Sequence, residues 1–156
     1  MKWIAVDYGE RRTGLAVCDA SELIVTPVTP QIEEKSLNKV AEAAAAARLA
    51  QGAEGGVCGL PRNMDGTEGS RCVKSRRFAA RLATACGVPV VLWDERRTTV
   101  TAAGILSANS TFGADRKARL DSVSAAVILE SFLAWRKAHP GEEPPEVAAP
   151  TAPEQA

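Results

Sequence analysis

Two apolar runs in this sequence end in acidic side chains. Asp7 follows the run 3–6, and Asp94 and Glu95 follow the run 88–93. If both runs are parallel strands, their carboxyl ends lie at one edge of a sheet, where open α/β sheets bind ligands. The alternatives are that Asp7 only makes a turn and that Asp94 and Glu95 only begin a helix, whose dipole favours acids there.

A third acid, Asp121, stands within a predicted helix over about 117–138. On that helix it falls on the same side as Ala125, Ile128 and Phe132, so it is predicted to face the core. A carboxylate among apolar side chains costs several kcal/mol unless it is paired or bound to a cation. The alternative to a cation site is a structural ion pair with an arginine or lysine.

Taken together, Asp7, Glu95 and Asp121 suggest a site for a divalent metal. Oxygen ligands without histidine suit Mg²⁺ or Mn²⁺. Such a site hydrolyses phosphodiesters without a side-chain nucleophile. The only histidine, His139, stands near the carboxyl end, which argues against Ser-His-Asp catalysis and a histidine-rich zinc site.

Basic residues gather where a phosphate backbone could bind. The segment 71–81 holds five bases and no acid, and Lys74, Arg77 and Arg81 fall on the side of its predicted helix away from the apolar residues. The alternative is a helix face that is merely solvated. The chain is poor in aromatic residues, so recognition through backbone and shape is favoured over base stacking. More arginines stand near predicted strand ends: Arg11, Arg12, Arg62, Arg96 and Arg97.

Periodicity and turn residues predict one α/β domain over residues 1–139. We expect a mixed sheet of five strands, three antiparallel and hairpin-connected and the rest parallel, flanked by helices. The strands are expected near 3–6, 13–18, 23–32, 55–60 and 88–93, and the helices near 36–51, 70–86, from 98 or 99 towards 107, and 117–138. Pro27 and Pro30 place the third strand at an edge. Residues 140–156, rich in Pro, Ala and Glu, are expected to form a disordered tail.

Length and charge narrow the class of protein. A chain of 156 residues has room for one core. Its 19 basic and 19 acidic residues balance, but four glutamates in the last sixteen positions leave the rest mildly basic. The longest uncharged stretch, 98–114, is too polar for a membrane span, and the early Asp7 argues against a signal peptide. A cytoplasmic protein is therefore expected.

Four segments, in order, resemble motifs of the YqgF/RuvX family. They are DYGERRTGLAV (7–17), GLPRNMDGTE (59–68), DERRTT (94–99) and LDSVSAAVIL (120–129). The resemblance spans about residues 2–136 and implies an RNase H-like fold. It also implies a nuclease that matures the 5′ end of 16S ribosomal RNA, and the family is described as Holliday-junction-resolvase-like as well. Asp7, Glu95 and Asp121 match the family's acids, and the resemblance implies Asp94 as a further candidate metal residue.

The leading hypothesis is therefore a Mg²⁺- or Mn²⁺-dependent endonuclease in ribosome biogenesis, acting on a structured rRNA precursor. One alternative keeps the active site and changes the substrate to four-way DNA junctions. The other is a non-catalytic module that binds RNA or a transcription complex. The sequence does not distinguish a monomer from a dimer. The residues expected to contact the substrate are Gly9, Arg11, Arg12, Arg62, Asn63, Lys74, Arg77, Arg81, Arg96 and Thr98.

Overall fold

The computed structural model describes residues 1–97, 113–148 and 150, with side chains for 1–96, 122–148 and 150. The predicted helix from Thr98 or Thr99 lies outside the described residues. The elements are β1 (Trp3–Asp7), β2 (Arg12–Cys18), β3 (Val25–Glu33), α1 (Leu37–Gln51), β4 (Gly55–Leu60), α2 (Ser70–Cys86), β5 (Val90–Asp94), a 3-10 turn (Glu95–Arg97) and α4 (Gly113–Ala138).

The five strands form one mixed sheet in the order β3-β2-β1-β4-β5. β1 pairs antiparallel with β2, and β2 pairs antiparallel with β3. β4 pairs parallel with both β1 and β5. The predicted arrangement is confirmed, including the edge position of β3, where the missing amide hydrogens of Pro27 and Pro30 are tolerated.

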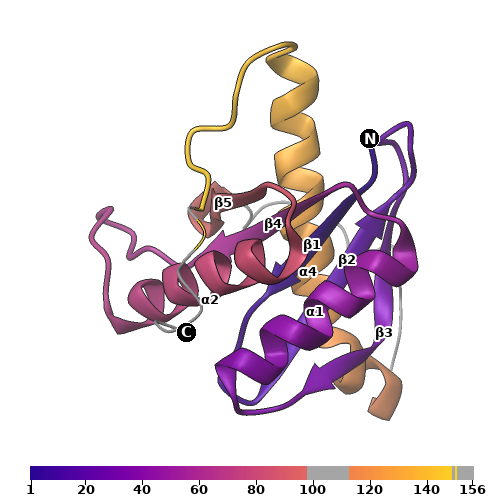
Figure 1. Cartoon of the computed structure of the whole chain (residues 1–156), viewed down its shortest axis with the longest axis vertical. Helices are drawn as coiled ribbons and strands as arrows, with labels where there is room; N and C mark the ends of the chain where they lie inside the picture. The colour runs from indigo at the N-terminus through magenta and orange to yellow at the C-terminus, as the bar shows by residue number, and fades with distance from the viewer. Residues whose placement is uncertain (98–112, 149, 151–156) are drawn as a thin grey trace.

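Helices cover both faces of this sheet, with α1 and α2 on one face and α4 on the other (Figure 1). Side chains alternate between the faces along each strand. In β1, Ile4 and Val6 belong to the core under α1 and α2, whereas Trp3 and Ala5 belong to the core under α4. The same alternation places Asp7, the next odd position, on the α4 side.

The helix ends follow from local chemistry. The Ser36 hydroxyl accepts a hydrogen bond from the Lys39 backbone N–H at the start of α1, and Gly52 ends that helix at φ 69°. Gly87 ends α2 in the same way, at φ 67°. Among the described helices, none is long and apolar enough to cross a bilayer.

α4 is fixed to the sheet by an aromatic cluster. The fully buried Phe132 ring meets Trp3 and Trp93 edge-on, with centroids 4.8 and 5.4 Å away. One turn later the Arg136 guanidinium lies 5.0 Å from the Trp3 ring centroid and makes two hydrogen bonds, of 2.8 and 3.0 Å, to the Glu22 carboxylate. These contacts set the position of α4 over β1 and β5.

The tail differs from the sequence-based expectation over residues 140–148. Val147 forms an antiparallel bridge with Val91, the Leu92 N–H donates to the Glu146 carbonyl oxygen, and the Ala148 N–H donates to the Val90 carbonyl oxygen. Ala148 is buried in the core under α1 and α2. The expectation of disorder for 140–148 was wrong because an unpaired edge strand supplies backbone partners that composition does not reveal. Residues 149 and 151–156 lie outside the described part.

Candidate active site

Asp7 and Glu95 lie at the same edge of the sheet. β1, β4 and β5 are parallel, so their carboxyl ends meet at one edge. Asp7 is the last residue of β1, and Glu95 directly follows the last residue of β5. β4 runs between these two strands, so two interstrand spacings, about 10 Å, separate their backbones.

Gly59 of β4 lets the Glu95 carboxylate lie over this intervening strand. Val6 pairs with Cys58, so Asp7 is next in register with Gly59. A Cβ at Gly59 would lie 2.9 Å from Glu95 Oε2 and 2.6 Å from Ile128 Cδ1 of α4. Since Ile128 belongs to the α4 side of the sheet, Glu95 and Asp7 share a face as well as an edge.

The Glu95 side chain is in an environment that disfavours its charge. Burial raises the pKa of Glu95, the Arg71 guanidinium lowers it, and the Asp94 carboxylate raises it again, with a net upward shift. A divalent cation would offset this cost, and carboxylate oxygens are the donors that Mg²⁺ and Mn²⁺ prefer. The chemistry of these two acids therefore fits the expected metal.

Asp121 lies on α4, seven residues before Ile128. Arg136 lies over Trp3 at the start of β1, and Ile128 reaches Gly59 near the end of β4, so α4 runs opposite to β1. Its earlier turns therefore extend towards the edge that carries Asp7 and Glu95. The Asp121 side chain is outside the described residues, and the residues whose side chains are described contain no group of three metal-binding side chains.

Asp94 ends β5 directly before Glu95, and two arginine side chains pair with its carboxylate. Its carboxylate accepts hydrogen bonds from the Arg96 guanidinium, at 2.6 Å, and from the Arg96 backbone N–H, at 3.0 Å. Arg62 Nη1 lies 3.5 Å away. Burial raises the pKa of Asp94, but the hydrogen bonds and charge of Arg96 and the charge of Arg62 outweigh it and lower the pKa overall. Asp94 thus holds two arginines beside the acids.

A cavity of about 440 Å³ opens beside Glu95. Arginines from three elements line it: Arg62 after β4, Arg71 in the first turn of α2, and Arg96 after β5. Asn63 and Met64 line it too, from the loop 61–69. Among the described side chains, one carboxylate and three guanidinium groups line this cavity, a combination suited to binding a phosphodiester.

The loop 61–69 is organised by its own polar side chains. Asn63 Nδ2 donates to Thr67 Oγ1 at 2.9 Å, and the Thr67 backbone N–H donates to Asp65 Oδ1 at 2.9 Å. Gly66 adopts φ 90°, which favours glycine. Arg96 Nη1 reaches the Met64 carbonyl oxygen at 3.4 Å, which ties the loop to the acidic edge.

The other predicted substrate contacts are spread over the surface. Lys74 and Arg77 are exposed on α2, with Lys74 paired to Glu10, and Arg81 donates to Asn38 at 3.3 Å. Arg11 is exposed in the turn before β2, Arg12 is exposed at the first position of β2, and Thr98 lies outside the described residues. Gly9 lies in that turn, which requires glycine because a Cβ at this position would lie 2.3 Å from the Arg12 carbonyl oxygen.

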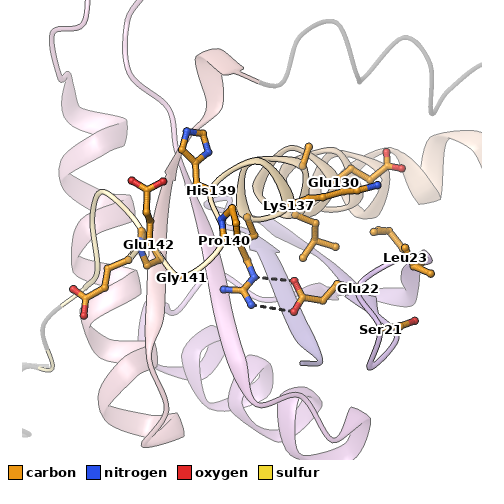
Figure 2. Close-up of a pocket in the computed structure, with 15 residues that line it drawn as sticks. Ser21, Glu22, Leu23, Glu130, Lys137, His139, Pro140, Gly141 and Glu142 are labelled. Carbon is orange, nitrogen blue, oxygen red and sulfur yellow. Dashed lines mark hydrogen bonds and ion pairs between the residues drawn. The ribbon is translucent and has the colours of Figure 1, made fainter.

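A larger cavity, of about 920 Å³, lies at the other end of α4 (Figure 2). The turn at Ser21 and Leu23 and the segment from His139 to Glu142 line it, beside the Glu22–Arg136 ion pair. Since Arg136 lies over Trp3 at the start of β1, this cavity is far from the edge that carries Asp7. We assign it no part in the chemistry.

Sequence reasoning placed Arg71 and Arg76 in the basic segment but did not name them as site residues. It also missed Glu68 and Glu146, which bind Arg76 at 2.6 and 3.0 Å. Arg71 could have been found from its place in the first turn of α2, directly after a glycine-containing loop. Glu146 had no such signal, because its contacts depend on how the chain folds back.

Replacing Gly59 with alanine should impair the site more than the fold. The new Cβ would displace the Glu95 carboxylate, and we expect kcat to fall by about 10²-fold and the free energy of unfolding by about 1–3 kcal/mol. Gly56→Ala on the same strand is the control, because its Cβ would make only an ordinary 3.5 Å contact with Val90. Cleavage kinetics and urea denaturation measure both effects. Unchanged kcat in Gly59→Ala would refute the placement of Glu95.

The chain is similar to known proteins over most of its length. The family model described as RuvX, Holliday junction resolvase, matches residues 1–135. The chain belongs to the RuvX family. A relative from Syntrophus aciditrophicus, named "Putative pre-16S rRNA nuclease", is 40% identical over 133 residues, which cover 85% of this chain and 88% of the relative. A relative of the same name from Anaeromyxobacter sp. is 39% identical, over 85% of this chain and 96% of the relative.

Solved structures place this RuvX-family chain in the RNase H-like fold. A Thermus thermophilus RuvC in complex with a Holliday junction substrate superposes with a TM-score of 0.60 and 13% identity, over 89% of this chain and 97% of that one. A second T. thermophilus RuvC structure gives a TM-score of 0.56 at 12% identity, over 88% and 97%. The expected fold and family are thereby confirmed.

Proposed function

We propose that this RuvX-family protein is a metal-dependent endonuclease that acts on structured RNA in the 5′-end maturation of pre-16S rRNA, in the cytoplasm. The proposal is carried by the position of Asp7 and Glu95 at the carboxyl ends of parallel strands, with Glu95 beside a cavity lined by three arginines. The names of the relatives support the RNA substrate.

Each group has a role in this proposal. Asp7, Glu95 and Asp121 would hold Mg²⁺ or Mn²⁺, and the bound ion would supply Lewis-acid activation of water and charge stabilisation of the leaving oxygen. Arg62, Arg71 and Arg96 orient the phosphodiester and offset its charge, and the Asp94 carboxylate fixes two of these guanidinium groups. Asn63, which lines the same cavity, would contact the same phosphodiester. The remaining predicted contacts would bind the backbone farther from the cut: Gly9, Arg11, Arg12, Lys74, Arg77 and Arg81. Thr98 stays a predicted contact outside the described residues.

A second candidate substrate is a four-way DNA junction. The description of the matching family favours it. Symmetric resolution of a junction needs two active sites, hence a dimer, whereas trimming one RNA end needs one.

A side-by-side cleavage assay tests both. End-labelled pre-16S rRNA 5′ fragment and a four-way DNA junction are incubated at equal concentration with the protein and Mn²⁺ or Mg²⁺. We expect the RNA to be cut at a defined position and the junction to be cut at least tenfold more slowly. If the junction receives paired symmetric incisions and the RNA stays intact, the four-way DNA junction replaces RNA as the proposed substrate. Binding of RNA without cleavage of either substrate would favour a non-catalytic module.

A further inference from the structure

The segment 146–148 acts as an added strand on the free edge of β5. The Leu92 N–H donates to the Glu146 carbonyl oxygen at 3.1 Å, and the Ala148 N–H donates to the Val90 carbonyl oxygen at 2.8 Å. Of the three side chains only Ala148 is buried, and Val147 is 51% exposed. Little apolar surface therefore holds the segment, and its other anchor is the Glu146 side chain.

That side chain occupies a site built from two arginines. Glu146 Oε1 lies 2.5 Å from Arg62 Nη2, and Glu146 Oε2 lies 3.0 Å from Arg76 Nη2. Arg62 follows β4 and Arg76 belongs to α2, so two separate elements direct guanidinium groups at one anion. Arg62 also lines the cavity beside Glu95.

The local charge balance depends on Glu146. Among the described side chains, the cluster contains the arginines Arg62, Arg76 and Arg96 and the acids Glu68, Asp94 and Glu146, joined by ion pairs. With Glu146 in place the charges cancel. Without it the cluster carries one net positive charge, and two of its arginines, Arg62 and Arg96, line the cavity that we assign to a phosphodiester.

We propose that Arg62 and Arg76 form a binding site for a backbone phosphate of the nucleic acid and that Glu146 occupies this site in cis as an internal competitor. The proposal rests on the proposed function for the source of the phosphate. Guanidinium groups bind carboxylate and phosphate with the same paired hydrogen bonds, so the two anions exclude each other. The carboxyl-terminal segment thus lowers the affinity for substrate until it is displaced.

An RNA-binding assay in EDTA, which removes the divalent metal and so prevents cleavage, tests this competition. The full-length protein is titrated into a fluorescently labelled RNA hairpin from the pre-16S 5′ region, in EDTA, and anisotropy gives Kd at several salt concentrations. We expect Glu146→Gln to lower Kd about fivefold and to steepen the dependence of log Kd on log salt concentration by about 0.8, the effect of one more phosphate contact. Adding Arg76→Gln to Glu146→Gln should remove both effects.

Glu143→Gln is the matched control, because Glu143 is an exposed acid three residues earlier on the same segment. It should leave Kd within about twofold and the salt dependence unchanged, as a general charge effect falls off over the Debye length. If Glu146→Gln behaves like Glu143→Gln, or tightens binding without changing the salt dependence, the inference is overturned.

The outcome is separable from that of the proposed function. A Glu146→Gln protein that binds RNA more tightly while no variant cleaves it with Mn²⁺ would uphold the phosphate site and reject the nuclease. Cleavage by the wild-type protein with no effect of Glu146→Gln on binding would uphold the nuclease and reject the competitor.

Discussion

Asp7→Asn should reduce the rate of RNA cleavage by about 10³-fold or more and leave the fold intact. Asparagine keeps the size of the side chain at the end of β1 but removes the charge that would bind the metal. A 10³-fold lower rate equals a loss of about 4 kcal/mol of transition-state stabilisation, which the bound metal would supply. Single-turnover cleavage with Mn²⁺ measures the rate, and a thermal melt should show Tm within about 2 °C of wild type.

Asp19→Asn is the control for this substitution. Asp19 follows β2, beside the amino ends of the parallel strands and away from Asp7. Its carboxylate accepts hydrogen bonds from the backbone N–H groups of Leu23 and Ile24. Asparagine can accept the same bonds, so cleavage should stay within about twofold. Equal rates in Asp7→Asn and wild type would show that Asp7 is not part of the active site.

Phe132→Ala should cause the largest loss of stability. The buried Phe132 ring makes edge contacts with Trp3 and Trp93, so its removal leaves a cavity between α4 and the sheet. Large-to-small substitutions of buried phenylalanine cost about 3–5 kcal/mol. Urea denaturation monitored by far-UV circular dichroism measures the change in the free energy of unfolding.

Lys137→Ala is the comparison on the same helix, because Lys137 is exposed. It should change the free energy of unfolding by less than about 0.5 kcal/mol. A loss below about 1 kcal/mol in Phe132→Ala would mean that the aromatic cluster does not hold α4 in place. Since α4 carries Asp121, cleavage should also become more temperature-sensitive in Phe132→Ala.

Local sequence signals were enough to predict most of the fold. The run 88–93 was expected to be a fully apolar strand that ends beside Asp94 and Glu95, and β5 ends at Asp94. Ser36 caps the start of α1, and Gly52 ends the helix in the left-handed backbone conformation, as the types of these two residues predict. Such signals act within a few residues, which is why element limits and the positions of Asp7 and Glu95 could be predicted from sequence.

Contacts between distant segments could not be predicted in this way. Pairing of Val147 with Val91 depends on β5 being an edge strand, which only the assembled sheet reveals. The pairing of Glu146 with Arg62 and Arg76 follows from that docking. Nor does the sequence indicate that Arg96 folds back onto the carboxylate of Asp94, two residues earlier.

The location of bound metal tests the central claim most directly. Crystals soaked in Mn²⁺ and measured at the manganese absorption edge should show anomalous density between Asp7 and Glu95, at about 2.1 Å from a carboxylate oxygen of each and within reach of Asp121. Density that contacts neither acid, or none at this edge of the sheet at saturating Mn²⁺, would contradict the account.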